Sequence, residues 1–201
     1  MSSFNTFLIT SLGFLLVISG SVAAHADVLF EPSVGYRTES LKLTDKNTTA
    51  ETKLTMATPV YGLKLGYRSP LGIDINLAGD YSTGKATFSP LSEKNNFTHT
   101  TMAAQLGISA MGLMKIYLGY GFSNELKVDA GTLNSDMKLK GNAYQAGLQF
   151  RVSQWFSIGG QYTLNQFSSI EGAAYGAGSS PDLYYSKVDS QDLSLTLSLE
   201  L

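Results

Sequence analysis

The chain has no cysteine, few charged residues and no block of basic residues. The absence of cysteine excludes a disulfide framework and metal sites built on thiolates. Charged residues make up 15% of the chain, whereas soluble domains usually carry roughly 25%. The formal net charge is −2, and without a basic block nucleic acid is not expected as a partner. Glycine (20) and tyrosine (11) are plentiful instead, so the composition differs from that of an ordinary water-soluble domain.

Long apolar runs are also scarce, with one exception at the N-terminus. Residues 7–23 (FLITSLGFLLVISGSVA) form an apolar run, and Ala24-His25-Ala26 supplies the small-x-small pattern that a signal peptidase recognises. No Lys or Arg precedes the run, which departs from the usual signal peptide, and an uncleaved membrane anchor is the alternative. We predict a cleaved signal peptide over 1–26 and one domain over 27–201. The second part contains no run of about 18 apolar residues, so no transmembrane helix is expected there.

Alternation of apolar and polar residues with a period of two recurs eight times after residue 26. The eight segments are 28–36, 61–67, 73–81, 102–108, 116–122, 144–152, 156–164 and 193–201. Short turns at 68–72, 111–115 and 153–155 alternate with long polar connections at 43–59, 83–99, 124–142 and 167–188. This order predicts an all-β fold, an eight-stranded antiparallel up-and-down transmembrane β-barrel with turns at one rim and four long loops at the other.

The polar face of these segments indicates which side meets lipid. The outer face of a soluble barrel should be rich in charge, at roughly 25–35% of its residues. The polar positions of 101–109 and 157–165 carry Thr, Ala, Gln, Gly, Ser and Asn, and none is charged. We therefore expect the polar face to fill a small lumen and the apolar face to meet lipid. A soluble lipocalin-like barrel, with these faces reversed, is the alternative.

Aromatic residues are expected to form two rings around the barrel. If the strands alternate in direction, the turn-side ring contains Phe30, Tyr67, Phe150 and Phe156. The loop-side ring contains Tyr36, Tyr61, Tyr81, Phe122, Tyr144 and Tyr162. Four strands carry a pair of aromatic residues six positions apart, which at about 3.3 Å per residue and a tilt near 40° separates the rings by roughly 15 Å. Such rings mark the two interfaces of a membrane.

Two hairpins carry a family resemblance. LGYRSPLGIDINLAGDYS (65–82) and GLQFRVSQWFSIGGQYTL (147–164) both run from an aromatic residue through a short turn to an apolar-x-apolar strand that closes on another aromatic residue. They resemble the OmpA/OmpX-type outer-membrane β-barrel superfamily, without a C-terminal peptidoglycan-binding domain. One difference is that such barrels usually end in Phe or another aromatic residue, whereas this chain ends in Leu201.

The resemblance implies the location and the partners of the protein. We expect it in the outer membrane of a Gram-negative-type envelope, as a monomer with both termini in the periplasm. Outer-membrane lipid and lipopolysaccharide would surround it, and periplasmic chaperones and the barrel-assembly machinery would act during export. Because an open strand edge in lipid costs several kcal/mol per unsatisfied group, the last segment should pair with the first.

Charged residues in the strands are the strongest candidates for a functional site. They occupy the alternate positions that are expected to face the lumen. They are Glu31, Arg37, Lys64, Arg68, Asp74, Asp80, Arg151, Asp192 and Glu200. Strand order suggests that Arg68 pairs with Glu31 or Asp74 near the turn rim, and Arg37 with Asp192 near the loop rim. We expect a paired charge network that plugs the narrow interior. A narrow channel for small solutes is the alternative.

Two features of the segment bear on its function, a single histidine and a tyrosine-containing loop. The segment 27–201 has one histidine, His99, and a lipid A-modifying enzyme would need such a base beside a hydroxyl. We expect no enzymatic activity and assign no catalytic residue, cofactor or metal. The loop at 168–188 places Tyr175, Tyr184 and Tyr185 among Gly and Ser, a composition that forms contacts. These tyrosines are expected to be exposed, and the protein is expected to serve as a structural anchor or to bind an extracellular ligand through its loops.

Overall fold

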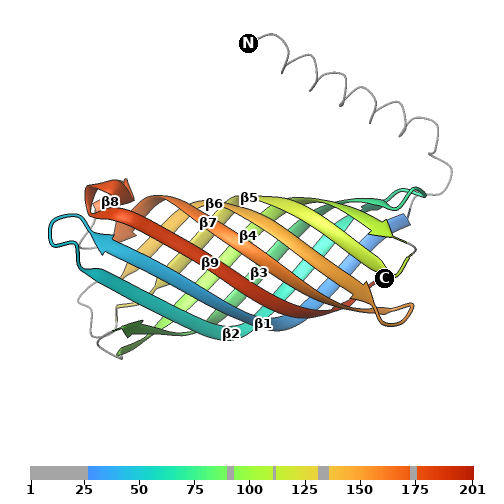
Figure 1. Ribbon diagram of the computed structural model, residues 1–201, viewed down its shortest axis with the longest axis horizontal. Coiled ribbons are helices and arrows are strands. Elements are labelled where there is room, and N and C mark those ends of the chain that lie inside the picture. Colours follow the sequence, from blue (N-terminus) through green and yellow to red (C-terminus); the bar gives the residue numbers. More distant parts are fainter. Residues whose placement is uncertain (1–26, 90–92, 111, 131–135, 173–175) are drawn as a thin grey trace, which may run out of the picture.

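The fold is taken from a computed structural model, which describes residues 27–89, 93–110, 112–130, 136–172 and 176–201. The predicted signal peptide at 1–26 lies outside these described residues. Eight long strands, β1 to β7 and β9, close into a barrel, and Figure 1 shows that they cross the molecule at a common tilt. Their bounds are β1 Asp27–Asp45, β2 Glu51–Arg68, β3 Ile73–Ser89, β4 Glu93–Ala110, β5 Met114–Val128, β6 Met137–Arg151, β7 Phe156–Gly172 and β9 Tyr185–Leu199.

Each wall strand pairs antiparallel with the strands before and after it in the chain. A short strand, β8 (Gly176–Ser179), and the 3-10 helix η1 (Pro181–Leu183) lie in the connection between β7 and β9, and β8 pairs antiparallel with the end of β7. The prediction of an eight-stranded antiparallel up-and-down barrel is therefore confirmed. Among the described residues, no helix is long and apolar enough to cross a membrane.

The last strand closes the barrel. β9 pairs with β1 from Ser33↔Ser198 to Asp45↔Tyr185. On its other side it pairs with β7 from Phe156↔Leu199 to Asn165↔Ser190. Beyond the strand, the backbone N–H of Leu201 donates to the carbonyl of Phe30 at 3.0 Å, and the N–H of Phe30 donates to the carbonyl of Leu201 at 3.2 Å. The alternating sequence at 192–201 is thus the closing strand, and it removes the open edge that lipid would penalise.

The apolar face of the strands points outward, as predicted. Leu77 and Leu118 are 61% and 65% exposed, whereas the inward Gln105 and Thr163 are 3% and 2% exposed. The aromatic residues assigned to the two rings also lie on the outer surface, with Phe30 the least exposed at 40% and Tyr36 and Tyr61 the most exposed at 54%. This orientation overturns the alternative of a soluble, lipocalin-like barrel.

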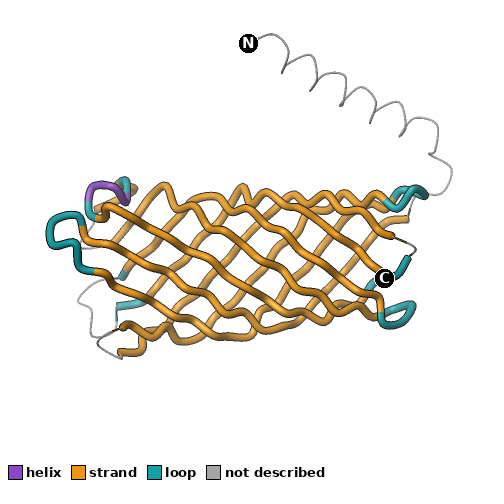
Figure 2. Tube along the Cα trace, in the orientation of Figure 1, coloured by secondary structure: helices purple, strands orange, loops and turns teal. Residues whose placement is uncertain are grey.

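The predicted bounds of the four long connections are wrong. β1 continues to Asp45 and β2 begins at Glu51, so the connection predicted over 43–59 shrinks to five residues, 46–50. The other three connections also consist mostly of strand (Figure 2). The barrel wall therefore extends well past the residues of the loop-side aromatic ring. We call this part the barrel extension.

The strands continue because apolar and polar residues still alternate in the barrel extension. There, however, the polar residues face outward and the apolar residues face inward. Lys42 and Lys53 point outward and are exposed, whereas the inward Leu41 and Leu54 are fully buried. Outside the membrane the outer face meets water and must be polar, and the interior can then be apolar, as in a soluble protein. The predicted strands ended at this reversal because they were defined by an apolar outer face.

The interior of the barrel extension is filled by what we call the inner apolar cluster. It consists of Leu41, Leu43, Leu54, Met56, Ala86, Phe88, Phe97, Leu126, Val128, Met137, Leu139 and Ile170. None of its side chains is more than 7% exposed, and Phe167, Tyr184, Tyr185 and Val188 pack against it. At about 25 cal/mol per Å² of buried apolar surface, such a cluster is a major source of stability for the barrel extension.

Candidate functional site

A charge network lies at the turn rim of the lumen. The Arg68 guanidinium donates to both carboxylate oxygens of Asp74, at 2.8 and 3.0 Å, and to Glu200 at 3.3 Å. Arg151 also donates to Glu200, and the Ser157 hydroxyl donates to the same carboxylate at 2.7 Å. The structure therefore pairs Arg68 with Asp74, one of the two partners expected from the sequence, and adds Glu200.

The other expected partner, Glu31, belongs to a second network one layer deeper. Its fully buried carboxylate accepts from Lys115 at 3.0 Å and from Gln149 at 2.9 Å, and Lys64 lies 3.4 Å away. Lys115 also lies 3.4 Å from Asp74 and so joins the two networks. The sequence reading missed Lys115 because it was assigned to a turn, whereas β5 begins one residue before it.

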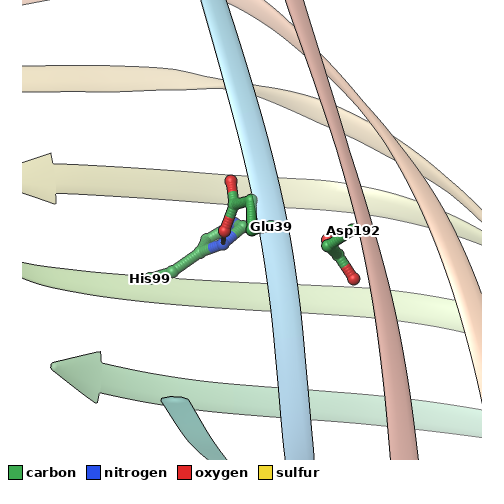
Figure 3. A group of neighbouring side chains, drawn as sticks. All are labelled: Glu39, His99 and Asp192. Carbon is green, nitrogen blue, oxygen red and sulfur yellow. Dashed lines mark hydrogen bonds and ion pairs between the residues drawn. The ribbon is translucent and has the colours of Figure 1, made fainter. Parts of the chain in front are cut away.

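A third network lies toward the loop side. Arg37 is 2% exposed and lies 3.5 Å from Asp80 and 3.6 Å from Asp192. Near it, the Nδ1 atom of His99 lies 2.7 Å from a carboxylate oxygen of Glu39 (Figure 3). The sequence predicted that Arg37 pairs with Asp192, but Glu39 was not among the predicted lumen charges.

The hydrogen bonds of His99 indicate its charge. Its Nε2 atom lies 2.7 Å from the side-chain oxygen of Asn124, while the amide nitrogen of Asn124 donates to Asn165 at 2.9 Å. Both ring nitrogens therefore face oxygen acceptors, and both contacts are hydrogen bonds only if both nitrogens carry protons. Glu39 then neutralises a histidine cation that is fully buried.

Glu39, His99 and Asp192 are also the one group of described residues with the spacing of metal ligands, since each offers an atom within 4.8 Å of the others. Most of their atoms already have partners, and Oδ1 of Asp192, which accepts no hydrogen bond, lies 3.6 Å from the Nε atom of Arg37. Both nitrogens of His99 are bonded, Ser190 donates to the other oxygen of Glu39 at 3.2 Å, and Arg37 lies beside Asp192. A metal ion would have to displace these contacts beside the Arg37 cation, so the group is better explained as an ion-pair network.

Charge is balanced across the three networks. With His99 protonated, they contain six positive residues, namely Arg37, Lys64, Arg68, His99, Lys115 and Arg151. They also contain six negative residues, namely Glu31, Glu39, Asp74, Asp80, Asp192 and Glu200. Buried charges are tolerated when they are paired and hydrogen-bonded. The lumen is thus filled by mutually compensating side chains, and the inner apolar cluster lies beyond them.

The outer face of the barrel extension carries lysines. Eight of them lie on the strands: Lys42, Lys53, Lys85, Lys94, Lys127, Lys138, Lys140 and Lys187. The last four each form an ion pair, with Asp129, Glu125, Glu171 and Asp189 respectively. Among the side chains that the structure describes, none offers the first four lysines a carboxylate oxygen within 4.0 Å. We call Lys42, Lys53, Lys85 and Lys94 the basic flank, because they lie on the adjacent strands β1 to β4.

The hollows in the described part of the chain include two of similar volume. One, of about 500 Å³, lies at the turn rim and is lined by Arg68, Lys115, Arg151 and Glu200 among others. The other, of about 480 Å³, lies in the wall beside the upper end of the β7–β9 pairing, which stops at Asn165↔Ser190. Leu164, Phe167 and Val188 contribute apolar surface to the second hollow.

The tyrosines expected at the surface are placed differently. Tyr184 and Tyr185 are only partly exposed, because they pack against the inner apolar cluster. Tyr175 lies outside the described residues. The signal that was missed is the apolar interior of the barrel extension, which gives aromatic residues of this connection a surface to cover.

A closed antiparallel barrel with an apolar outer belt, two aromatic rings and a polar interior defines an outer-membrane β-barrel protein. The family described as "Outer membrane protein beta-barrel domain" matches residues 12–199, and the chain belongs to this family. By this membership the protein is located in the outer membrane, where the short turns of such barrels face the periplasm and the opposite end is extracellular.

Solved structures share the fold at low sequence identity. Ail, the attachment invasion locus protein of Yersinia pestis, solved in complex with the heparin analogue sucrose octasulfate, is 17% identical, with a TM-score of 0.56 over 87% of this chain and 99% of Ail. OprG from Pseudomonas aeruginosa is 16% identical, with a TM-score of 0.51 over 90% of this chain and 99% of OprG. Neisserial surface protein A is 14% identical, with a TM-score of 0.51 over 88% and 99%. No curated protein sequence matches the chain.

Proposed function

We propose that the protein is a non-conducting barrel that anchors a folded surface in the outer membrane, and that this surface serves structural or recognition purposes. The observation that carries the proposal is the double filling of the interior. Paired charges occupy the lumen at the level of the membrane, and the inner apolar cluster, at most 7% exposed, occupies the barrel extension. A hydrated solute would have to displace both layers.

Conductance across a planar lipid bilayer tests this proposal. The purified, refolded protein should give no discrete openings above the bare membrane. Steady openings of the unmodified protein would overturn the non-conducting barrel.

A narrow channel for small solutes is the second candidate. Between the charge networks the interior is lined by neutral polar side chains, including Gln105, Gln145, Gln161 and Thr163, which suit a polar path. Tyr117, whose hydroxyl donates to Gln161 at 3.0 Å, crosses that space, however. If the channel hypothesis is correct, substituting Tyr117 by Ala should raise the conductance of a protein that already conducts.

We further propose that the protein is not an enzyme. His99, the histidine that a lipid A-modifying reaction would need as its base, is fully buried and bonded to Glu39 and Asn124. Neither ring nitrogen is thus available to a hydroxyl nucleophile. The mass spectrum of lipid A from cells expressing the wild type, a His99→Ala variant or an empty vector should be the same. A lipid A species that requires the wild type would contradict the proposal.

Recognition by the outer surface is the more specific part of the proposal. Ail, a barrel of the same fold, was solved with a sulfated saccharide analogue, but an identity of 17% shows the fold alone. The support therefore comes from this chain's own barrel extension, an extracellular wall of folded strands rather than of loops. Such a wall presents fixed side chains at fixed spacings, which is what a contact surface requires.

A further inference from the structure

The basic flank is the feature of the outer surface that the filled interior leaves unexplained. We infer that Lys42, Lys53, Lys85 and Lys94 bind the phosphate groups of the glycolipid that forms the outer leaflet around the barrel. This inference deepens the proposed recognition function by assigning it a partner, and it rests on the folded barrel extension rather than on the closed lumen.

Register brings the four lysines together in two pairs. Lys42 of β1 and Lys53 of β2 are direct cross-strand partners. Lys85 of β3 is opposite Asn96 of β4, and Lys94 is opposite Thr87, so Lys85 and Lys94 are diagonal neighbours. Direct partners have Cβ atoms about 5 Å apart and diagonal neighbours about 7–8 Å apart. Each pair therefore has a spacing that one phosphate group can bridge.

Like charges placed directly opposite on a sheet are destabilising unless a counter-charge lies between them. Glu51 lies two positions from Lys53 on the same outer face, but among the described side chains no carboxylate oxygen comes within 4.0 Å of the four lysines. Asp189 is the cross-strand partner of Lys42 on β9, but it forms its ion pair with Lys187 of its own strand. On the other side of the barrel, Lys127, Lys138 and Lys140 each have a carboxylate. The flank thus keeps a positive charge that the opposite wall neutralises internally.

Hydroxyl groups surround the two lysine pairs. Thr55 lies opposite Thr87, and Ser89 lies opposite Lys53, all on the outer face between the pairs. These hydroxyls can donate to phosphate oxygens and to sugar hydroxyls. β1 carries Tyr36, and β2 and β3 carry the cross-strand pair Tyr61 and Tyr81 of the loop-side ring. Tyrosine at this level anchors the barrel at the boundary between acyl chains and headgroups.

Height and direction favour a lipid over a soluble ligand. The lysines of β1, β2 and β3 lie four to eight positions beyond the ring tyrosines of the same strands, which at about 3.3 Å per residue and a tilt near 40° places them roughly 10–20 Å beyond the ring. Lys94 lies at the same level, because it is opposite Thr87, two positions beyond Lys85. That is the layer of headgroups and their attached sugars. Side chains on a barrel wall point sideways, toward neighbouring lipids, and a ligand arriving from the medium would first meet the tips of the hairpins.

The test compares two variants with the same change in charge. One replaces Lys42, Lys53, Lys85 and Lys94 by Gln, and the matched control replaces Lys127, Lys138, Lys140 and Lys187 by Gln. Band shifts in SDS with and without boiling first establish that both variants are folded. Each protein in a neutral detergent is then titrated with bis-phosphorylated lipid A and with the same lipid A after removal of its phosphates, and native mass spectrometry counts the bound lipid.

The flank variant should bind bis-phosphorylated lipid A at least about tenfold more weakly than the wild type, since each lysine near an anionic lipid surface contributes measurably. The control should remain within about twofold, and the dephosphorylated lipid should bind all three proteins equally weakly. Equal losses in the two variants would reduce the effect to net charge and overturn the proposal. A parallel titration uses sucrose octasulfate as a soluble sulfated ligand. If the flank variant lost binding of this ligand and kept lipid A, the lysines would serve a soluble sulfated ligand and the lipid assignment would be wrong. Because lipid retention and conductance are separate readouts, this inference can fail while the non-conducting barrel stands.

Discussion

His99 and Glu39 lie 60 positions apart in the sequence, yet the Nδ1 atom of His99 is 2.7 Å from a carboxylate oxygen of Glu39 inside the barrel. They come from β4 and β1, which are not neighbours in the wall, so the pair bridges the lumen. Both side chains are at most 1% exposed. A buried charge without its partner is costly, and the pair therefore ties opposite sides of the barrel together.

We expect Glu39→Leu to lower the free energy of unfolding by about 3–5 kcal/mol, because it leaves the His99 cation buried without its counter-ion. The double substitution Glu39→Leu with His99→Leu should recover much of this loss, since it removes both charges. Urea unfolding of the refolded protein in lipid vesicles measures the two values. If the single and the double variant were equally unstable, the pair would not be coupled and the histidine would not carry a charge.

The inner apolar cluster leads to a second prediction. Phe97→Ala should destabilise the barrel by about 3–5 kcal/mol, because the aromatic ring is 1% exposed and its loss leaves a cavity. Thr98→Ala, on the outer face of the same strand, is the matched control and should change stability little. Equal effects of the two substitutions would mean that the barrel extension has no packed interior.

The inward orientation of apolar residues in the barrel extension can be tested by placing a lysine at an inward position next to an outward one. Leu54→Lys places a cation inside the inner apolar cluster, where the side chain is 0% exposed, and should abolish the heat-modifiable folded form. Lys53→Leu changes the neighbouring outward position and should leave the band shift intact. A folded Leu54→Lys variant would show that this stretch behaves as the loop expected from the sequence.

The membrane-spanning part of the fold could be predicted because lipid imposes a simple rule there. Apolar residues must alternate with residues that face the lumen, and this rule gave the eight strands, their order and the outward aromatic rings. The barrel extension escaped because the rule reverses at its boundary. At Lys42 and Leu43, for example, the polar residue faces out and the apolar residue faces in.

Ion pairs across the lumen could be predicted only in part. Arg68 and Asp74 flank one short turn, so sequence proximity suggests their contact. Glu31 of β1 reaches Lys115 of β5, on a strand that is far from β1 in the wall. Such a contact depends on the stagger of the strands around the barrel and on the length of the lysine side chain. The alternation of apolar and polar residues does not predict either of these.

The closing strand gives a third kind of test, on assembly. Leu195→Pro removes a backbone donor from β9, which pairs with both β1 and β7 at this residue. Proline in the middle of a sheet is poorly tolerated, and in lipid each lost hydrogen bond costs more than in water. We expect the variant to be missing from the outer-membrane fraction and to show no band shift on boiling. Leu195→Ala, which keeps the backbone donor at a lipid-facing position, should assemble normally.

Asp45, at the extracellular end of β1, should make the order of one hairpin depend on pH. Its carboxylate accepts hydrogen bonds from the backbone N–H groups of Asn47 and Thr48, both at 2.8 Å, and from the Thr48 hydroxyl at 3.0 Å. These bonds, with the backbone bond from Thr48 the most important, lower the pKa of Asp45 below its ordinary value. The carboxylate therefore stabilises the hairpin above the pKa of the unfolded chain, and this contribution is lost as the pH falls through the lowered pKa.

Amide hydrogen exchange at Asn47 and Thr48 reports on this turn directly. Protection, corrected for the intrinsic pH dependence of exchange, should be constant near neutral pH and should fall in acid below the ordinary pKa of an aspartate. Asp45→Asn keeps an oxygen acceptor but does not titrate, so its protection should not change with pH, whereas Asp45→Ala should lose protection at every pH. If the wild type and Asp45→Asn responded identically to acid, the turn would be held by the strands beside it and the carboxylate would have no part in its stability.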